Sequence, residues 1–320
     1  MPINFLKFQK MILFIIKKIF QGIPVLLGVI TISFILMYIA PGDPVRAMVG
    51  DYFDETTVQQ LREELGLNLP IHKQYVNYLY STLTGDLGKS FITQRPVITD
   101  LVQKFKYTFQ LAAFAMLVAI PLGICFGIIA AVNKGSMIDK LLIVISLAGI
   151  SAPVFWIALL LILVIGLYLQ WLPPTGFGGI KFLILPAIAL GTRSLAMIVR
   201  LTRTYILDVL NEDYIRTAIA KGLSTKIILF KHALRNALVP LITIIASDFG
   251  SYLSGAVLTE SIFGWPGLGR FALNAIMKRD FPAIQGTVLF TAIIIVLINI
   301  IVEIIYAYVD PRVRDAIIDE

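Results

Sequence analysis

Few residues of the types that perform catalysis or hold a metal occur in this chain. It contains one cysteine, Cys125, and two histidines, His72 and His232, which lie 160 residues apart. Zinc and iron–sulfur sites need cysteine or histidine ligands grouped at short spacings. The sequence therefore predicts no catalytic residues, no metal site and no disulfide within the chain.

One short segment resembles part of a nucleotide-binding loop. Gly88-Lys89-Ser90 matches the end of the phosphate-binding pattern G-x-x-x-x-G-K-[ST], which also needs a glycine five residues before Gly88. Leu83 stands at that position, and no strand-like run precedes the segment. We therefore expect no nucleotide site on this chain.

Ionisable residues inside apolar runs are costly and mark functional hypotheses. Asp248 lies near the middle of one run, either as a hydrogen-bonded or neutral packing group or as an anion beside a path for a cationic solute. Glu303 lies near the end of the last run, where an ion pair between helices is the favoured interpretation. Arg193 is either the partner of Glu303 or a side chain that extends to the membrane surface.

A second charged pair flanks a turn-like segment. Glu260 and Arg270 lie on either side of Trp265-Pro-Gly. The sequence is compatible with a re-entrant element that forms an outer gate, and equally with an inert turn. The candidate outer-gate residues are therefore Glu260, Trp265 and Arg270.

The elements that position these residues are apolar helices. Hydrophobic residues make up 58% of the 320 residues and charged residues only 15%, with a mean hydropathy of +0.86. Soluble domains are about half apolar and about a quarter charged, so lipid is the expected solvent of most of the surface. The net charge of +7 is spread between apolar runs without a basic stripe, which argues against nucleic acid as a partner.

Six segments are long enough to cross the ~30 Å hydrocarbon layer as helices. They are Ile19–Ile39, Thr108–Val132, Leu141–Leu169, Phe182–Arg200, Ala237–Leu258 and Gly286–Tyr308. The first follows several lysines, as a signal peptide does, but its length and the lack of a cleavage site favour a retained anchor. Prolines such as Pro153 are expected to kink or pack a helix. The predicted fold is an all-α membrane protein with six transmembrane helices.

The distribution of lysine and arginine predicts cytoplasmic N and C termini. The short loop 133–140 carries two basic residues, whereas the loop 170–181 carries one at its edge. The predicted parts are a cytoplasmic N-terminal segment (1–18), a membrane domain (19–308) and a cytoplasmic tail (309–320). The membrane domain contains an outer loop (41–107) and a cytoplasmic loop (202–235). Within the outer loop, Thr56–Leu65 and Pro70–Leu83 are predicted helices ended by glycines.

The cytoplasmic loop has the clearest helix signals outside the spans. Asn211 is expected to cap a helix over Glu212–Lys221, which ends at Gly222 in a left-handed conformation. A second short helix is predicted from Ser224 to about His232. A ten-residue helix is marginal by itself in water, so packing must order it.

Small residues on the predicted helix leave a surface that another protein can approach. They are Thr217, Ala218 and Ala220. Two interpretations remain open on the residues alone: a docking element for a partner, or a surface linker helix.

This loop resembles the EAA loop of ABC-importer permeases, in the form found in the dipeptide/oligopeptide/nickel permease family. It reads Asp213-Tyr-Ile-Arg-Thr-Ala-Ile-Ala-Lys-Gly-Leu223 and then His232-Ala-Leu-Arg-Asn-Ala-Leu-Val-Pro240. Three more segments resemble the first permease subunit of those importers: Ala40-Pro-Gly-Asp-Pro44, Leu258-Thr-Glu-Ser-Ile-Phe-Gly-Trp-Pro-Gly-Leu-Gly-Arg270 and Asp310-Pro-Arg-Val-Arg314. The resemblance covers nearly the whole chain in order.

The resemblance implies an ABC type I importer permease (MetI-like) fold and a coupling mechanism. In that family the EAA helix sits in a groove of a cytoplasmic ATPase, and ATP-driven closure of two ATPases moves the helix. ATP and Mg²⁺ would then be bound by the partner ATPases, with no cofactor on this chain. The implied ATPase-coupling residues are Asp213, Tyr214, Arg216, Thr217, Ala218, Ala220, Lys221 and Gly222.

The resemblance also implies the partners and the cargo. The partners are a homologous second permease, two cytoplasmic ABC ATPases and an extracytoplasmic substrate-binding protein, in the lipid of a prokaryotic plasma (inner) membrane that the chain crosses several times. The cargo is a dipeptide or oligopeptide, with nickel chelates or glutathione-like solutes as alternatives. Asp248 departs from the uncharged polar residue usual in the family, and its candidate role is contact with a peptide ammonium. A further alternative is an ion-coupled secondary transporter, although Asp248 is the one clearly central charge.

Overall fold

The computed structural model describes residues 2–39, 45, 55–64 and 66–309. Most of these residues lie in helices, and the described residues contain no strand apart from an isolated bridge between Lys89 and Pro96. Four helices are long and apolar enough to cross a membrane, or up to six spans if each of two bent helix pairs counts as one. The four are α1 (Pro2–Ile39), α5 (Val97–Val132), α8 (Lys181–Leu210) and α14 (Phe281–Val309). The prediction of an all-α membrane fold is confirmed.

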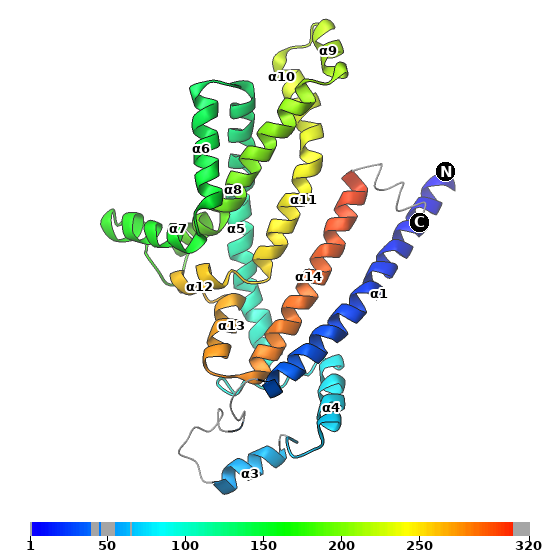
Figure 1. Cartoon of the computed structure of the whole chain (residues 1–320), viewed down its shortest axis with the longest axis vertical. Coiled ribbons are helices and arrows are strands. Elements are labelled where there is room, and N and C mark those ends of the chain that lie inside the picture. The colour runs from blue at the N-terminus through cyan, green and yellow to red at the C-terminus, as the bar shows by residue number, and fades with distance from the viewer. Residues whose placement is uncertain (1, 40–44, 46–54, 65, 310–320) are drawn as a thin grey trace.

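The short helices of the two long loops lie at opposite ends of the bundle (Figure 1). The coupling-loop helix α9 (Asp213–Ala220) lies at the end of the bundle that is nearer to the start of α1 and to the end of α14. The outer-loop helices α3 (Glu55–Glu64) and α4 (Ile71–Leu83) lie at the opposite end and agree with the predicted helices to within a few residues. Two segments that carried the family resemblance, 40–44 and 310–314, lie outside the described residues.

The predicted third span is not one continuous helix. Helix α6 (Met137–Ser151) ends, and α7 (Val154–Leu161) with the π-helix η1 (Ile162–Tyr168) leaves at an angle of 105°. Pro153 lacks an N–H donor and disfavours helical backbone in the residue before it, and Ala152 accordingly has extended dihedral angles. The expectation that this proline would only kink a helix over Leu141–Leu169 was wrong.

The predicted fifth span ends earlier than expected. Helix α11 (Leu234–Leu253) is followed by a turn at Gly255 and by two shorter helices, α12 (Val257–Phe263) and α13 (Leu268–Met277). Gly255 has φ +109°, and a Cβ there would lie 3.0 Å from the backbone nitrogen of Gly269. The backbone therefore turns where the apolar run alone predicted helix to Leu258.

Helices α5 and α8 form the longest packed pair, and small residues let them approach closely. A Cβ on Gly127 would lie 2.5 Å from the Thr202 side chain, and one on Gly191 would lie 3.0 Å from the Ala115 carbonyl oxygen. Gly127 meets Thr202 toward one end of the pair, and Gly191 meets Ala115 further along it. The close contact therefore extends along much of the pair. Helix α8, which leads into the coupling loop, is held firmly by this contact.

Helix α1 is attached to the bundle mainly through α14 and to the outer loop through α4. Lys18 lies 2.9 Å from Glu303 of α14, and the Thr31 hydroxyl lies 2.9 Å from the Tyr75 hydroxyl of α4. Glu303 therefore forms the expected ion pair between helices, with Lys18 as its partner in place of Arg193.

Candidate functional site

The coupling loop begins where α8 ends. Asn211 follows the last residue of α8, and its side-chain amide donates to the carbonyl oxygen of Leu207. The residue preceding α9 is Glu212, in an extended conformation and without a side-chain cap. The expectation that Asn211 caps the coupling helix was wrong, because its side chain satisfies the end of the preceding helix instead.

Helix α9 packs through a narrow apolar stripe. Ile215 and Ala218 are buried against Ile228, Val209 and Leu210. Ala218 thus faces the chain's own loop, whereas the sequence analysis placed it on the surface open to a partner. The other seven coupling candidates are exposed: Asp213, Tyr214, Arg216, Thr217, Ala220, Lys221 and Gly222.

Two contacts fix the direction in which the loop returns to the bundle. Gly222 has φ +77°, as predicted, which a residue with a Cβ adopts at a cost of about 1 kcal/mol or more. After it come α10 (Thr225–Ile227) and the π-helix η2 (Ile228–Ala233), which runs directly into α11. The Asn236 amide of α11 donates to the Tyr214 hydroxyl at 2.7 Å. Helix α9 is therefore connected to both α8 and α11.

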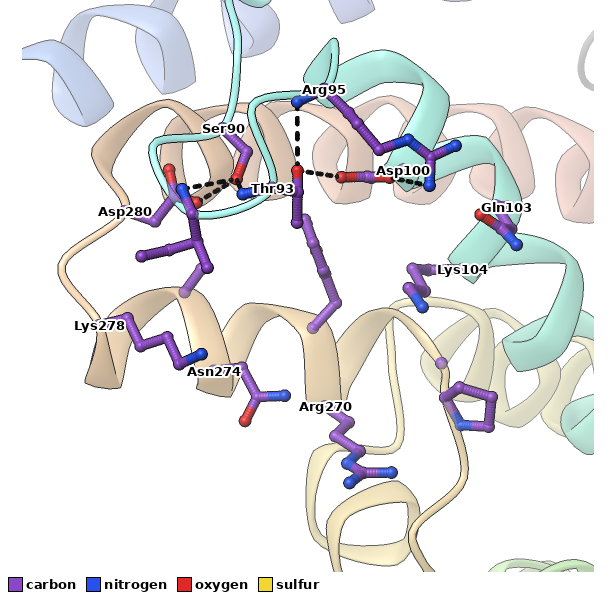
Figure 2. A pocket seen from close by; sticks show the side chains of 15 residues that line it. Ser90, Thr93, Arg95, Asp100, Gln103, Lys104, Arg270, Asn274, Lys278 and Asp280 are labelled. Atoms are coloured by element: carbon purple, nitrogen blue, oxygen red, sulfur yellow. Dashed lines mark hydrogen bonds and ion pairs between the residues drawn. The ribbon is translucent and has the colours of Figure 1, made fainter. Parts of the chain in front are cut away.

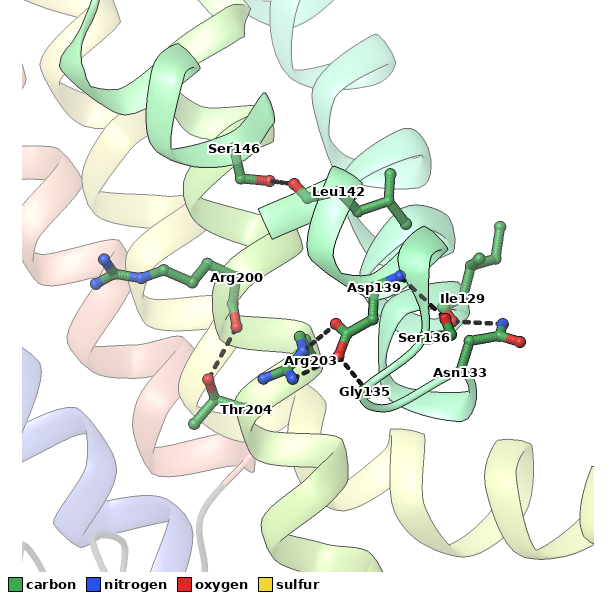
Figure 3. A network of polar contacts seen from close by, with 10 residues as sticks. All are labelled: Ile129, Asn133, Gly135, Ser136, Asp139, Leu142, Ser146, Arg200, Arg203 and Thr204. Carbon is green, nitrogen blue, oxygen red and sulfur yellow. Dashed lines mark hydrogen bonds and ion pairs between the residues drawn. The ribbon is translucent and has the colours of Figure 1, made fainter. Parts of the chain in front are cut away.

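An ion pair between a partly buried arginine and a buried aspartate joins α8 to α6 (Figure 3). The Arg203 guanidinium donates to both carboxylate oxygens of Asp139, from Nε at 2.6 Å and from Nη2 at 2.8 Å. Asp139 also accepts the Gly135 N–H at 2.8 Å, and the Ser136 side chain caps α6 by accepting the Asp139 N–H. Bidentate geometry makes this the strongest class of charged hydrogen bond.

This ion pair was not predicted from the sequence. A signal existed in the Ser136 to Asp139 spacing, which is typical of a helix N-terminus. The partner Arg203 lies 64 residues further on, so the pairing depends on how α6 packs on α8.

At the other end of the bundle, α12 and α13 form a hairpin that brings Glu260, Trp265 and Arg270 together. Glu260 is fully buried, and its carboxylate accepts the Thr108 hydroxyl of α5 at 2.8 Å and the Arg270 N–H at 3.0 Å. The Thr108 hydroxyl in turn accepts the Leu268 N–H at 2.8 Å. One carboxylate thus joins α12, the start of α13 and α5.

Burial raises the pKa of Glu260, and the N–H and O–H donors around its carboxylate oppose that shift. The space is filled closely, because a Cβ on Gly267 would lie 2.3 Å from the Glu260 carboxylate. The carboxylate also lies at the N-terminus of α13, where a helix favours negative charge. Each of these features describes an anchored hairpin and not a free turn.

The remaining two residues of the predicted outer element reinforce the hairpin. The Trp265 indole N–H donates to the Tyr107 carbonyl oxygen at 2.9 Å, and its ring packs edge-on against Phe177 with centroids 5.1 Å apart. The Arg270 guanidinium donates to the carbonyl oxygen of Gly264, the left-handed residue that ends α12. A gating role remains a proposal, whereas the mutual proximity of the three residues is established.

Asp248 lies on α11 and is partly buried. Its carboxylate accepts a hydrogen bond from Ser194 of α8 at 2.5 Å, and the Ser194 hydroxyl lies 2.6 Å from the hydroxyl of Tyr252. Tyr252 donates onward to the Leu190 carbonyl oxygen at 2.8 Å. Asp248 is therefore a hydrogen-bonded member of an interhelical network.

No group of three histidine, cysteine, aspartate or glutamate side chains lies close enough to hold a metal within the described residues. The polar clusters of this part of the chain instead connect helices to one another.

Two family models match the chain in succession. The N-terminal model of the membrane component of binding-protein-dependent transport systems matches residues 11–112, and the model of the inner membrane component of these systems matches residues 123–315. Curated relatives match over nearly their whole length. The dipeptide transport system permease protein DppB of Escherichia coli strain K12 is 38% identical, over 95% of this chain and 99% of its own.

Other relatives carry different printed cargoes. The di/tripeptide transport system permease protein DppB of Pseudomonas aeruginosa is 39% identical and the glutathione transport system permease protein GsiC of Escherichia coli strain K12 is 38% identical, each over 95% of this chain and 99% of its own.

A solved structure supports the fold. A chain of the MetNI methionine ABC transporter in an inward-facing conformation superposes with a TM-score of 0.53 at 17% identity, over 67% of this chain and 97% of its own. The protein therefore belongs to the family of binding-protein-dependent transport system inner membrane components, as a permease subunit of an ABC importer with a MetI-like helical fold.

Proposed function

We propose that this chain forms half of a translocation pathway for dipeptides or short oligopeptides. The other half is a homologous second permease, and an extracytoplasmic substrate-binding protein delivers the cargo. The support comes from relatives named for dipeptide and di/tripeptide transport that match the chain nearly end to end.

The observation that carries the coupling part of the proposal is the exposure of α9. An eight-residue helix with two buried residues is marginal alone, yet its exposed surface combines polar and small residues with the larger side chains of Tyr214 and Ile219. Such a surface is suited to a groove on a partner. We propose that two cytoplasmic ABC ATPases hold the coupling helices, and that ATP and Mg²⁺ bind to those subunits while this chain carries no cofactor and no catalytic residue.

The proposed location is the prokaryotic plasma (inner) membrane, crossed several times, with lipid around the apolar spans. Residues 1–18 and 309–320 are cytoplasmic, residues 19–308 form the permease domain, and the loops 41–107 and 202–235 face outward and inward. Helices α3 and α4 lie at the end opposite α9, which supports this division (Figure 1).

The cargo is the least constrained part of the proposal. A glutathione permease is as similar to this chain as a dipeptide permease is. Glutathione-like solutes and nickel chelates are therefore the alternative cargoes. Uptake of labelled dialanine in competition with glutathione distinguishes a dipeptide cargo from a glutathione-like one, because the preferred cargo displaces the other at lower concentration.

The experiment that tests coupling replaces Ala220 with Trp. Ala220 is exposed on α9, so the large ring should obstruct a partner groove without disturbing the buried stripe formed by Ile215 and Ala218. We expect normal membrane levels, about tenfold or greater loss of ATP-driven uptake in vesicles, and weakened ATPase retention during purification. Ala220→Ser keeps the small volume and serves as the matched control.

Two outcomes would contradict the proposal. Wild-type uptake with full ATPase retention in Ala220→Trp would show that α9 is a linker helix. Uptake driven by an ion gradient in the absence of ATP would identify a secondary transporter instead.

A further inference from the structure

A cavity of about 310 Å³ opens beside the outer hairpin, between the loop 88–96, the first turns of α5 and one face of α13 (Figure 2). Small-molecule sites in proteins begin at about this size. Its lining is rich in charged side chains: Arg95, Asp100, Lys104, Arg270, Lys278 and Asp280. The four cations exceed the two acids, so the lining carries a net charge of two positive units.

Both acids of the lining are engaged in holding the loop. The Asp280 carboxylate accepts the Ser90 hydroxyl at 2.5 Å and the Phe91 N–H at 3.0 Å. The Asp100 carboxylate accepts the Thr93 hydroxyl at 2.9 Å. Both aspartates are almost completely buried, so the loop that forms one wall of the cavity is fixed by charged hydrogen bonds.

The cations are engaged less fully. Arg95 lies 3.6 Å from Asp100, and the Arg270 guanidinium donates to the Gly264 carbonyl oxygen. For Lys104 and Lys278, the described residues provide no carboxylate within ion-pair distance. Figure 2 shows these two lysines on opposite sides of the cavity, with the Asn274 amide on the same row of α13 as Lys278.

We propose that this cavity, lined by Lys104 on one side and by Lys278 on the other, binds the carboxylate of a small solute. Neither ammonium group has a carboxylate partner among the described residues, so an anion in the cavity would stabilise whichever lysine it approaches. Asn274 offers a neutral amide donor to the same ligand. The cavity volume accommodates a compact solute and not a folded partner.

The carboxylate in question is the C-terminal carboxylate of a short peptide, an identification that rests on the proposed function. The cavity adjoins Arg270 and Gly267 of the hairpin, so an occupied cavity contacts the same element that Glu260 anchors. Cargo released at the outer end would meet this site before the apolar part of the bundle.

The test measures binding of dialanine to the purified assembled transporter, without binding protein and without nucleotide, by calorimetry or ligand-observed NMR. Coupling plays no part under these conditions, so a failure of the coupling hypothesis cannot mimic a failure here. The variants are Lys104→Gln, Lys278→Gln and the double replacement. Lys181→Gln is the matched control, because Lys181 is an exposed lysine at the start of α8 that does not line the cavity.

We expect each single replacement to weaken dialanine binding about threefold to tenfold, and the double replacement to weaken it more. Dialanine amide, which lacks the carboxylate, should bind about as weakly to wild type as dialanine binds to the double variant. Lys181→Gln should bind like wild type, and all variants should keep the wild-type thermal midpoint.

The proposal would be overturned by equal binding of dialanine and its amide, by unchanged binding in the double variant, or by displacement of dialanine by inorganic phosphate at equal concentration. The last would show a general anion site without selectivity for carboxylates. Loss of binding in Lys181→Gln to the same degree would equally reject it, since a general charge effect would then explain the data.

Discussion

The coupling loop and the outer hairpin are both short-helix elements at the two ends of one bundle, and they are held in opposite ways. Helix α9 buries two side chains, and among the described residues one side-chain hydrogen bond to another helix, from Asn236 to Tyr214, holds it. The hairpin buries Glu260 and Trp265 and connects both through hydrogen bonds to α5.

The difference indicates which of the two regions can move without large loss of stability. An element with few buried contacts can shift with a partner at small cost, whereas one built around a buried, fully hydrogen-bonded carboxylate resists displacement. The coupling loop is therefore suited to follow an ATPase. The hairpin is suited to hold a fixed shape, or to change only when its anchoring network breaks as a unit.

The largest effect is expected from breaking the hairpin anchor. Glu260→Ala leaves the Thr108 hydroxyl and the Arg270 N–H without their acceptor in a buried site, at a cost of about 3 kcal/mol. We expect a clearly lower thermal midpoint and reduced membrane levels. Glu63→Ala, which removes an exposed acid from α3, should leave both unchanged. A wild-type midpoint in Glu260→Ala would remove the contrast between the two regions.

A smaller effect is expected at the connection between α6 and the helix that carries the coupling loop. Asp139→Ala removes the acceptor of both hydrogen bonds that Arg203 donates to this carboxylate, and it leaves a partly buried guanidinium without its ion-pair partner, at a cost of about 2 kcal/mol. We expect lower stability together with weaker coupling of ATP hydrolysis to uptake. Asp208→Ala, an exposed acid on α8, is the control.

The exchange Asp139→Arg with Arg203→Asp distinguishes pairing from simple charge loss. Partial recovery of the midpoint relative to either single exchange supports a direct interaction. Additive losses in the double variant would show that each residue acts independently, and the inferred connection between α6 and α8 would have to be abandoned.

The smallest structural effect is expected at Asp248, on the helix that joins the two regions. Asp248→Asn keeps the shape and an oxygen acceptor for the Ser194 hydroxyl, so the free energy of unfolding should change by less than about 1 kcal/mol. If the carboxylate contacts a peptide ammonium, uptake of cationic and zwitterionic peptides should fall while basal ATP hydrolysis is retained. Unchanged uptake of every cargo would assign Asp248 to helix packing alone.

The sequence by itself determined the class of fold, because long apolar runs in a chain of low charge have one stable solution, helices in lipid. It also determined the left-handed turn at Gly222 and the approximate bounds of α3, α4 and α9, since glycine placement and helical periodicity are local properties. The motif of the coupling loop carried the family, which the relatives confirm.

The tertiary structure alone decided which residues meet. Ala218 turns inward because Ile228 of the returning chain covers it, and Glu303 pairs with Lys18 because α14 packs on α1. The break at Pro153 becomes a 105° bend and not a kink, a magnitude that the local preference of proline does not fix. Pairings such as Asp139 with Arg203 and Glu260 with Thr108 join residues 64 and 152 positions apart. Local preferences act over a few residues, so contacts at these separations follow only from the packing of whole helices.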